Sequence, residues 1–315
     1  MNNYCFKSIL SDELSNFIDF KRSLGYKYDI NTIFYCKCID RFWIDKGFKQ
    51  IKITQDIAYE YAVRKQDEKT STLKNRLYIF KHFSMFLVKQ GYENIYVYDK
   101  PIKQDKDIYI PYIYTDDDMI KIFDYIKNCN SIHKTQFLIL FELFYSTGIR
   151  LSEAINIKIK NINLENRTIE ILNSKNFSNR LVCLSNSMYN ELKKYLNNKF
   201  KNNDDYLFCT KNNNHFCKAS IDRFFRKLIK ETGIGTDAVN SPRIHDFRHS
   251  FAIKTLDLMY EKGYDYYNAL PLLQKYMGHR DIRYTEYYLK LTKYYHHKVI
   301  EVQEFYNNNI IPEVK

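Results

Sequence analysis

Two short segments of the 315-residue chain present arginines where they could bind a phosphate. Arg150 follows the Ser-Thr-Gly-Ile turn at 146–149, and Glu153 lies three residues further on. At this spacing the two side chains share a helix face, so the carboxylate can orient the guanidinium. The alternative for an isolated Arg-x-x-Glu is a surface ion pair. The segment His-Asp-Phe-Arg-His at 245–249 repeats the i,i+3 spacing, and an arginine fork matches two oxygens of a phosphate.

Three further residues stand out by type and position. His279 follows a predicted helix, so it is expected to be exposed at a junction, and Tyr288 lies nine residues later. Lys175 lies in the predicted turn of a hairpin, where a lysine is ordinarily only solvated. In a chain with 29 tyrosines, any one tyrosine is ordinarily a packing residue. His245 and His249, one turn apart, could bind a metal, but no His-Glu-x-x-His pattern or carboxylate cluster accompanies them.

The order and spacing of these segments resemble the tyrosine recombinases, also called the phage integrase family. The matching motifs are STGIRLSE at 146–153, Lys175 with Arg-Leu-Val five residues on, HDFRH at 245–249, and Met-Gly-His at 277–279 followed by Tyr288. The fold resemblance covers about 112–315. By position, the resemblance implies a catalytic set of Arg150, Lys175, His245, Arg248, His279 and Tyr288, with Glu153 as a supporting acid.

Three positions depart from the family pattern or leave a choice open. Cys183 stands where proline is common, and Tyr284 stands where threonine is common. Both lie outside the catalytic set. Tyr287 adjoins Tyr288, and the nine-residue step from His279 selects Tyr288 as the nucleophile.

The resemblance implies a site-specific DNA recombinase of the integrase or transposase type, which cleaves and rejoins DNA through a 3′-phosphotyrosyl intermediate. It also implies that no metal, ATP or other cofactor is needed, and that a homotetramer forms on a double-stranded recombination site. A type IB-like topoisomerase and a catalytically silent DNA-binding regulator are the alternatives. The regulator is disfavoured because no catalytic position is missing, and a zinc nuclease because acidic and cysteine ligands are not clustered.

Composition agrees with a polyanionic partner. The formal net charge is +12, and the excess of basic residues occurs in both halves of the chain, with 19 Lys and Arg against 14 Asp and Glu in residues 1–107. The seven scattered cysteines favour reduced thiols and a cytoplasmic protein, and Cys209, His215 and Cys217 lack the paired spacing of a zinc site. No secretory signal or membrane-spanning segment is expected.

The elements that must position these residues fall into two predicted domains, a helical core-binding domain with its linker at 1–107 and a catalytic domain at 108–315. Apolar residues at helical spacing predict helices over 14–20, 33–43, 57–63 and 71–91. The segment 98–114, with Pro101 and Pro111, reads as a linker.

The catalytic domain is predicted to be mainly helical with a small β component. The predicted helices are 115–128, 134–145, 150–157, 187–197, 218–231, 244–260, 271–277, 283–290 and a tail at 293–306. Segments 168–172 and 180–184 are rich in β-branched residues and flank a polar turn, so they predict a hairpin. Pro271 is expected in the first turn of its helix.

Overall fold

The computed structural model describes residues 5–101, 110–172, 179–197, 202–236, 238 and 240–295. The chain forms two compact units, residues 1–108 (unit 1) and 109–315 (unit 2). The predicted domain boundary near residue 107 lies within 102–109, outside the described residues. Each unit is described by itself.

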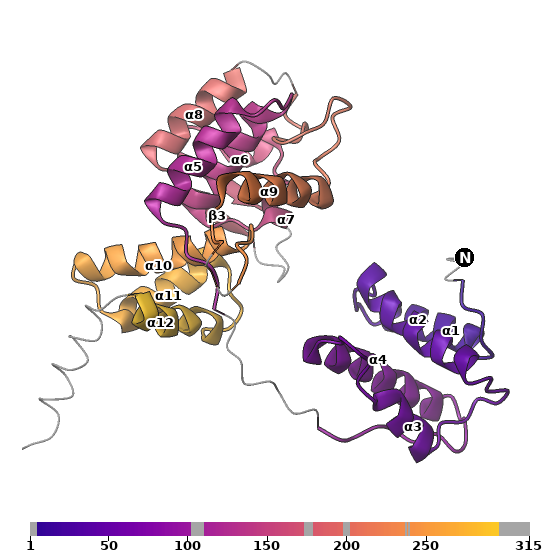
Figure 1. The fold of residues 1–315 in the computed structure, drawn as a ribbon. Helices are drawn as coiled ribbons and strands as arrows, with labels where there is room; N and C mark the ends of the chain where they lie inside the picture. The colour runs from indigo at the N-terminus through magenta and orange to yellow at the C-terminus, as the bar shows by residue number, and fades with distance from the viewer. Residues whose placement is uncertain are drawn as a thin grey trace, which may run out of the picture. The chain divides into compact units, whose positions relative to one another are not determined.

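The described part of unit 1 is a bundle of helices, as its apolar periodicity predicts (Figure 1). The helices are α1 (Ser11–Ser23), α2 (Ile30–Asp45), α3 (Gln55–Ala62) and α4 (Thr70–Lys89). The side chains of Asp29 and Thr54 accept hydrogen bonds from the first turns of α2 and α3, and these bonds fix where the helices begin. The core between the helices is aromatic, with Trp43, Phe80 and Phe83 fully buried.

In unit 2, helices come before and after the described sheet along the chain. Before the sheet come α5 (Asp116–Asn128), α6 (Lys134–Thr147), α7 (Leu151–Ala154) and the 3-10 turn Ile159–Asn161; after it come α8 (Asn186–Asn197) and α9 (Lys218–Thr232). Thr115 and Asp118 form a reciprocal capping box at the start of α5. The apolar helix α6 is buried in the main core of this unit, as its composition predicts.

The predicted hairpin is confirmed, and a third short strand joins it. The described strands β1 (Ile162–Asn163), β2 (Thr168–Ile171) and β3 (Arg180–Cys183) form an antiparallel sheet in the order β1-β2-β3. Ile169 pairs with Val182 on the buried face. β1 is two residues long, too short to produce a periodic pattern in the sequence.

Three helices complete unit 2: α10 (Asp246–Glu261), α11 (Tyr266–Met277) and α12 (Arg283–Tyr295). They lie together below the other helices of the unit in Figure 1 and share a second apolar cluster that includes Leu256, Leu273 and Tyr288. Phe247, at the start of α10, is buried in the main core instead, so α10 joins the two clusters. The predicted tail helix at 293–306 lies almost entirely outside the described residues.

The prediction that Pro271 opens its helix is wrong. The α11 helix begins at Tyr266 and contains Pro271 in its interior. The side chain of Asp265 accepts a hydrogen bond from the backbone of Asn268 and starts the helix one turn earlier than the proline signal indicated.

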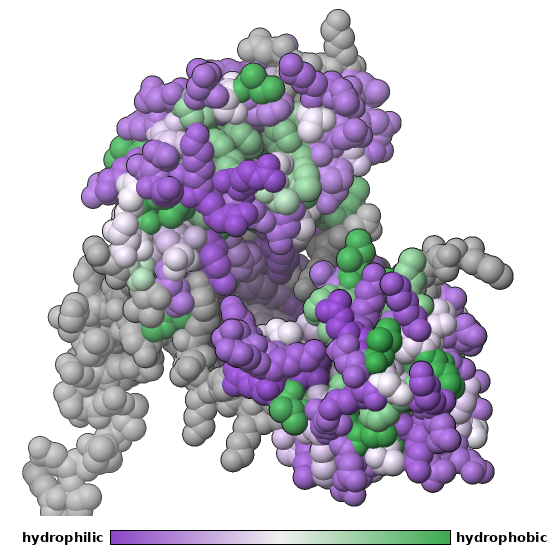
Figure 2. Space-filling view, turned by 45° about the vertical axis from the view of Figure 1, so that its right-hand side comes forward, coloured by the Kyte–Doolittle hydropathy of each residue, from purple (hydrophilic) through white to green (hydrophobic). Residues whose placement is uncertain are grey.

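Among the residues coloured in Figure 2, hydrophilic residues predominate, with hydrophobic residues scattered among them. No helix within the described ranges is long and apolar enough to cross a membrane.

Candidate active site

Five of the six predicted catalytic residues line one groove of unit 2, with a volume of about 1270 Å³. These residues are Arg150, His245, Arg248, His279 and Tyr288. They come from the starts of α7 and α10, the turn after α11, and α12. The sixth residue, Lys175, lies within 173–178, outside the described residues.

Arg150 and Glu153 interact as their spacing predicts. The backbone N–H of Arg150 donates to Glu153 Oε2 at 3.0 Å, and its Nη1 donates to Oε1 at 2.8 Å. Burial alone would raise the pKa of Glu153, but hydrogen bonds and charge from Arg180, and then from Arg150, hold it at about 2. Glu153 is therefore a carboxylate at neutral pH and orients Arg150 at the edge of the groove.

Arg248 is the most enclosed cation of the groove, with 2% of its surface exposed. Its guanidinium donates to the carbonyl of Gly148 at 2.8 Å, to the carbonyl of Met277, and to Nε2 of His279 at 3.1 Å. These contacts join the turn after α6 to the turn after α11. Burial and the nearby charge of Arg150 lower the pKa of Arg248 to about 9, so the guanidinium stays charged at neutral pH.

Gly148 is required where Arg248 meets the turn after α6. Its φ is +62°, and an added Cβ would lie 2.5 Å from the ring of Phe251. A side chain at this position would displace Phe251 and strain the backbone. Gly148 thus lets the backbone that carries Arg150 approach α10 closely.

The sequence predicts that His279 is exposed at a junction between elements. In the structure, its side chain is half-buried. Its Nε2 accepts from Arg248, and its Nδ1 lies 2.9 Å from Oγ1 of Thr285, which is fully buried. Burial, followed by the charges of Arg248 and Arg150, lowers the pKa of His279 to about 3. The ring is therefore neutral, held by Thr285 on one side and by Arg248 on the other.

His245 is open to the groove, whereas His249 is held among aromatic rings. The ring centroid of His249 lies 5.1 Å from that of His245 and 5.6 Å from that of Tyr288. Desolvation, and after it the positive charge of Arg248, lowers the pKa of His245 to about 4. Burial, and after it the neighbouring His245, lowers the pKa of His249 to about 3. Both rings are neutral at pH 7.

Tyr288 has 2% of its surface exposed, and its neighbour Tyr287 is half-buried and also lines the groove. Burial raises the pKa of the Tyr288 phenol, and Arg248 and Arg150 oppose this effect by their charge. The phenol is therefore protonated in this state but lies beside the two cations that would stabilise its anion.

Three residues that contribute to this arrangement received no role from the sequence. Arg180 binds Glu153, Thr285 anchors His279, and His249 contacts Tyr288. Arg180 and His249 lie within the family motifs, and Thr285 directly follows Tyr284 near the nucleophile. Their position beside the predicted catalytic residues is the only feature of the sequence that points to them. Within the described ranges, no group of three or more His, Cys, Asp or Glu side chains is arranged to hold a metal ion.

Comparison with known proteins places this groove in a family. Residues 113–294 match the phage integrase family. The chain is 25% identical over 298 residues to tyrosine recombinase XerD of Oceanobacillus iheyensis, covering 90% of this chain and 93% of that protein. It is 29% identical over 192 residues to tyrosine recombinase XerA of Pyrococcus horikoshii, and there it spans 61% of the relative's length.

The fold also has solved relatives. The crystal structure of XerH site-specific recombinase bound to the palindromic difH substrate, a post-cleavage complex, aligns with a TM-score of 0.63 and 23% identity, covering 82% of this chain and 75% of that one. At this identity the likeness concerns the fold.

Proposed function

The chain belongs to the phage integrase family, and we propose that it is a site-specific DNA recombinase that cleaves and rejoins double-stranded DNA through a 3′-phosphotyrosyl intermediate. The observation that carries the proposal is the meeting of Tyr288 with two charged arginines in one groove, since Arg150 and Arg248 both act on its pKa. A buried phenol beside two guanidiniums suits nucleophilic attack on a phosphodiester.

The arginines supply the electrostatic part of the reaction. When the Tyr288 oxygen attacks phosphorus, negative charge grows on the two non-bridging oxygens of a trigonal-bipyramidal centre. Preorganised cations stabilise this charge without reorganising during the step. Arg248 is rigidly held by Gly148 and Met277, and Arg150 by Glu153, so both guanidiniums have fixed positions before DNA binds.

Two protons must move in this step. The Tyr288 phenol loses one as the O–P bond forms, and the leaving 5′-oxygen gains one as its bond to phosphorus breaks. The neutral ring of His245 is open to the groove and can hydrogen-bond the phosphate or take up the phenol proton. His279 can do the same when the DNA replaces the contact between its Nε2 and Arg248. We assign the protonation of the 5′-oxygen to Lys175. The reverse sequence releases Tyr288 and needs no ATP, because the phosphodiester energy is kept in the phosphotyrosine.

The basic excess in both sequence halves supports contacts from both units to the DNA backbone. We further propose that the active assembly is a homotetramer on its recombination site. The seven cysteines all lie within the described ranges and form no disulfide there, which supports a cytoplasmic location.

A type IB-like topoisomerase shares this chemistry and is the second candidate. The match along 93% of the length of a tyrosine recombinase favours the recombinase. The two differ in product, because a topoisomerase relaxes a supercoiled plasmid, whereas a recombinase joins strands of two different duplexes.

The proposal is tested with a nicked duplex that carries the sequence footprinted by the protein beside its own gene. Cleavage near the nick releases a short fragment, so rejoining stops and a protease-sensitive covalent adduct accumulates, in EDTA and without ATP. Tyr288→Phe should bind the duplex but form no adduct, while the matched Tyr287→Phe should form it. An adduct with Tyr288→Phe would overturn the assignment of the nucleophile, and no adduct with the unaltered protein would overturn the function.

A further inference from the structure

Arg180 connects the hairpin to the active-site groove but is not part of the predicted catalytic set. It is the first residue of β3, and 8% of its side chain is exposed. Its Nη1 donates to Glu153 Oε1 at 3.0 Å and its Nη2 to Oε2 at 2.7 Å. This is a two-point fork between guanidinium and carboxylate, the strongest geometry for such a pair.

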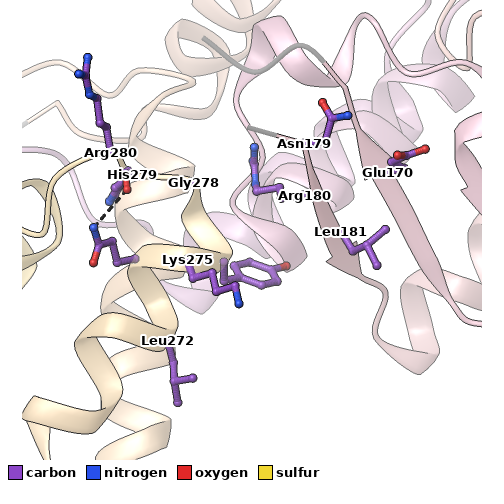
Figure 3. A pocket seen from close by; sticks show the side chains of 11 residues that line it. Glu170, Asn179, Arg180, Leu181, Leu272, Lys275, Gly278, His279 and Arg280 are labelled. Atoms are coloured by element: carbon purple, nitrogen blue, oxygen red, sulfur yellow. Dashed lines mark hydrogen bonds between the residues drawn. The ribbon is translucent and has the colours of Figure 1, made fainter. Parts of the chain in front are cut away.

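The turn after α11 is shaped around Arg180. Figure 3 shows Arg180 between the sheet and the end of α11, where Gly278 and His279 lie. A Cβ on Gly278 would come within 3.3 Å of Cδ and Nη1 of Arg180. The missing side chain at Gly278 therefore makes room for the arginine beside the residue that carries His279.

Glu153 is shared by two arginines of unequal exposure. Arg150 lines the groove and has 20% of its side chain exposed, whereas Arg180 lies behind Glu153 and is more deeply buried. If Glu153 were paired with Arg150 alone, the two charges would cancel and the groove would lose a cation at the phosphate. With Arg180 included, two guanidiniums meet one carboxylate, and the cluster keeps one net positive charge.

We propose that Arg180 is a positioning residue that neutralises Glu153, so that Arg150 is oriented by a carboxylate and still acts on the scissile phosphate with its full charge. This inference rests on the proposed recombinase function. Arg180 lowers the pKa of the Glu153 carboxyl more than Arg150 does, by its hydrogen bonds and by its charge.

The charge arithmetic gives a test that a merely structural role would not pass. Arg180→Met leaves one guanidinium and one carboxylate, so the cluster becomes neutral. Glu153→Gln combined with Arg180→Met restores a single net positive charge without restoring the fork. The rate of adduct formation is measured in single turnovers on the nicked duplex at saturating DNA, beside the DNA dissociation constant.

We expect Arg180→Met to slow adduct formation by roughly 10–100-fold, less than the cost of removing a preorganised donor itself, because Arg150 stays in place but its charge is offset by Glu153. DNA affinity should change little. The double variant should recover most of this loss. The matched control Arg167→Met, at an exposed arginine of the same sheet region, should keep the normal rate. A normal rate for Arg180→Met, or a double variant as slow as the single one, would overturn the inference.

Arg180→Lys guards against a variant that is too unstable to assay. It keeps the charge and loses the fork, so its rate should stay within about 10-fold of normal if neutralisation is what matters. A larger loss in a folded Arg180→Lys protein would contradict the inference. All of these outcomes are read against adduct formation by the unaltered protein, whose absence would refute the recombinase function itself.

Discussion

Unit 1 and unit 2 both bury arginine side chains, but they balance the charge differently. In unit 1, Arg76 is 2% exposed and donates from Nε and Nη2 to the two carboxylate oxygens of Glu68, both at 2.9 Å. The carbonyls of Tyr61 and Val63 accept its remaining hydrogen bonds. In unit 2, Arg150 and Arg180 share Glu153, while Arg248 is bound mainly by backbone carbonyls.

The difference separates a structural arginine from a functional cluster. One guanidinium and one carboxylate in unit 1 form a neutral, fully bonded pair whose role is to hold α3 and the following loop against α4. In unit 2, two guanidiniums share one carboxylate and a third, that of Arg248, is bound without one, which leaves an excess of positive charge in a partly dehydrated groove. Such an excess is costly to fold and becomes favourable only when an anion binds. The groove of unit 2 is therefore built for a phosphate at some expense to stability.

The largest expected effect concerns the neutral pair of unit 1. Arg76→Met should lower the free energy of unfolding of unit 1 by about 3–5 kcal/mol, because it leaves the buried Glu68 charge and two carbonyls without their partner. The chain's single tryptophan, Trp43, is buried in this unit, so its fluorescence during urea unfolding reports on unit 1 specifically. Lys81→Met, at an exposed position of the same helix, is the matched control. An unchanged urea midpoint for Arg76→Met would show that this pair is not structural.

The second prediction concerns unit 2, where loss of an arginine should reduce activity far more than stability. Arg150→Ala should leave stability within about 1 kcal/mol of normal, since Glu153 keeps Arg180 and a repulsion between cations is relieved. It should slow cleavage by about 10²–10³-fold, the cost of removing one preorganised donor.

A chemical control separates this role from that of Lys175. Replacing the 5′-bridging oxygen of the DNA by sulfur creates a leaving group that needs little protonation. This substrate should largely rescue Lys175→Ala, if Lys175 is the acid, and should not rescue Arg150→Ala, whose role is on the non-bridging oxygens. Similar responses from the two variants would place the acid elsewhere.

The sequence predicts features that depend on local residue spacing, and it does not predict contacts between residues that are far apart in the chain. The helices were predictable because stripes such as Leu73, Leu77 and Phe80 recur at helical spacing. Arg150 and Glu153 were predictable as a pair because they are three residues apart on one helix. Arg180 was not, because its contact with Glu153 joins residues 27 positions apart and depends on how the hairpin packs. The neutral pair of Arg76 and Glu68 was missed for a related reason, since the two lie eight residues apart, with Glu68 in the loop before α4 and Arg76 inside that helix.

The smallest effect we expect is a pH dependence confined largely to unit 2. Its groove holds His245, His249 and His279 with pKa values lowered to about 4, 3 and 3, while unit 1 has one histidine, His82, whose pKa burial also lowers. Because these pKa values lie below that of a histidine in the unfolded chain, about 6.5, the unfolded state binds more protons as the pH falls below 6.5. Stability is therefore complete above pH 6.5 and is lost as the pH decreases toward the folded-state values.

From pH 7 to pH 6, each histidine that stays neutral in the folded state should cost unit 2 at most about 0.7 kcal/mol, and the three together about 1–2 kcal/mol, because water and ions screen the more open His245. Carboxyl groups with ordinary or lowered pKa values stay charged over this interval. Burial raises the pKa values of Glu142 and Asp246 in unit 2, so any proton that they take up as the pH falls opposes the loss of stability. Urea unfolding followed by far-ultraviolet circular dichroism, compared with the Trp43 fluorescence signal, separates the two units.

His249→Phe keeps a planar ring that cannot titrate, and it should reduce the pH dependence of unit 2 by roughly the contribution of one histidine. Equal pH dependence in the two units would mean that the groove histidines are hydrated and readily protonated. In that case the surplus of positive charge would not be confined to the arginines, and the contrast between the two units would weaken.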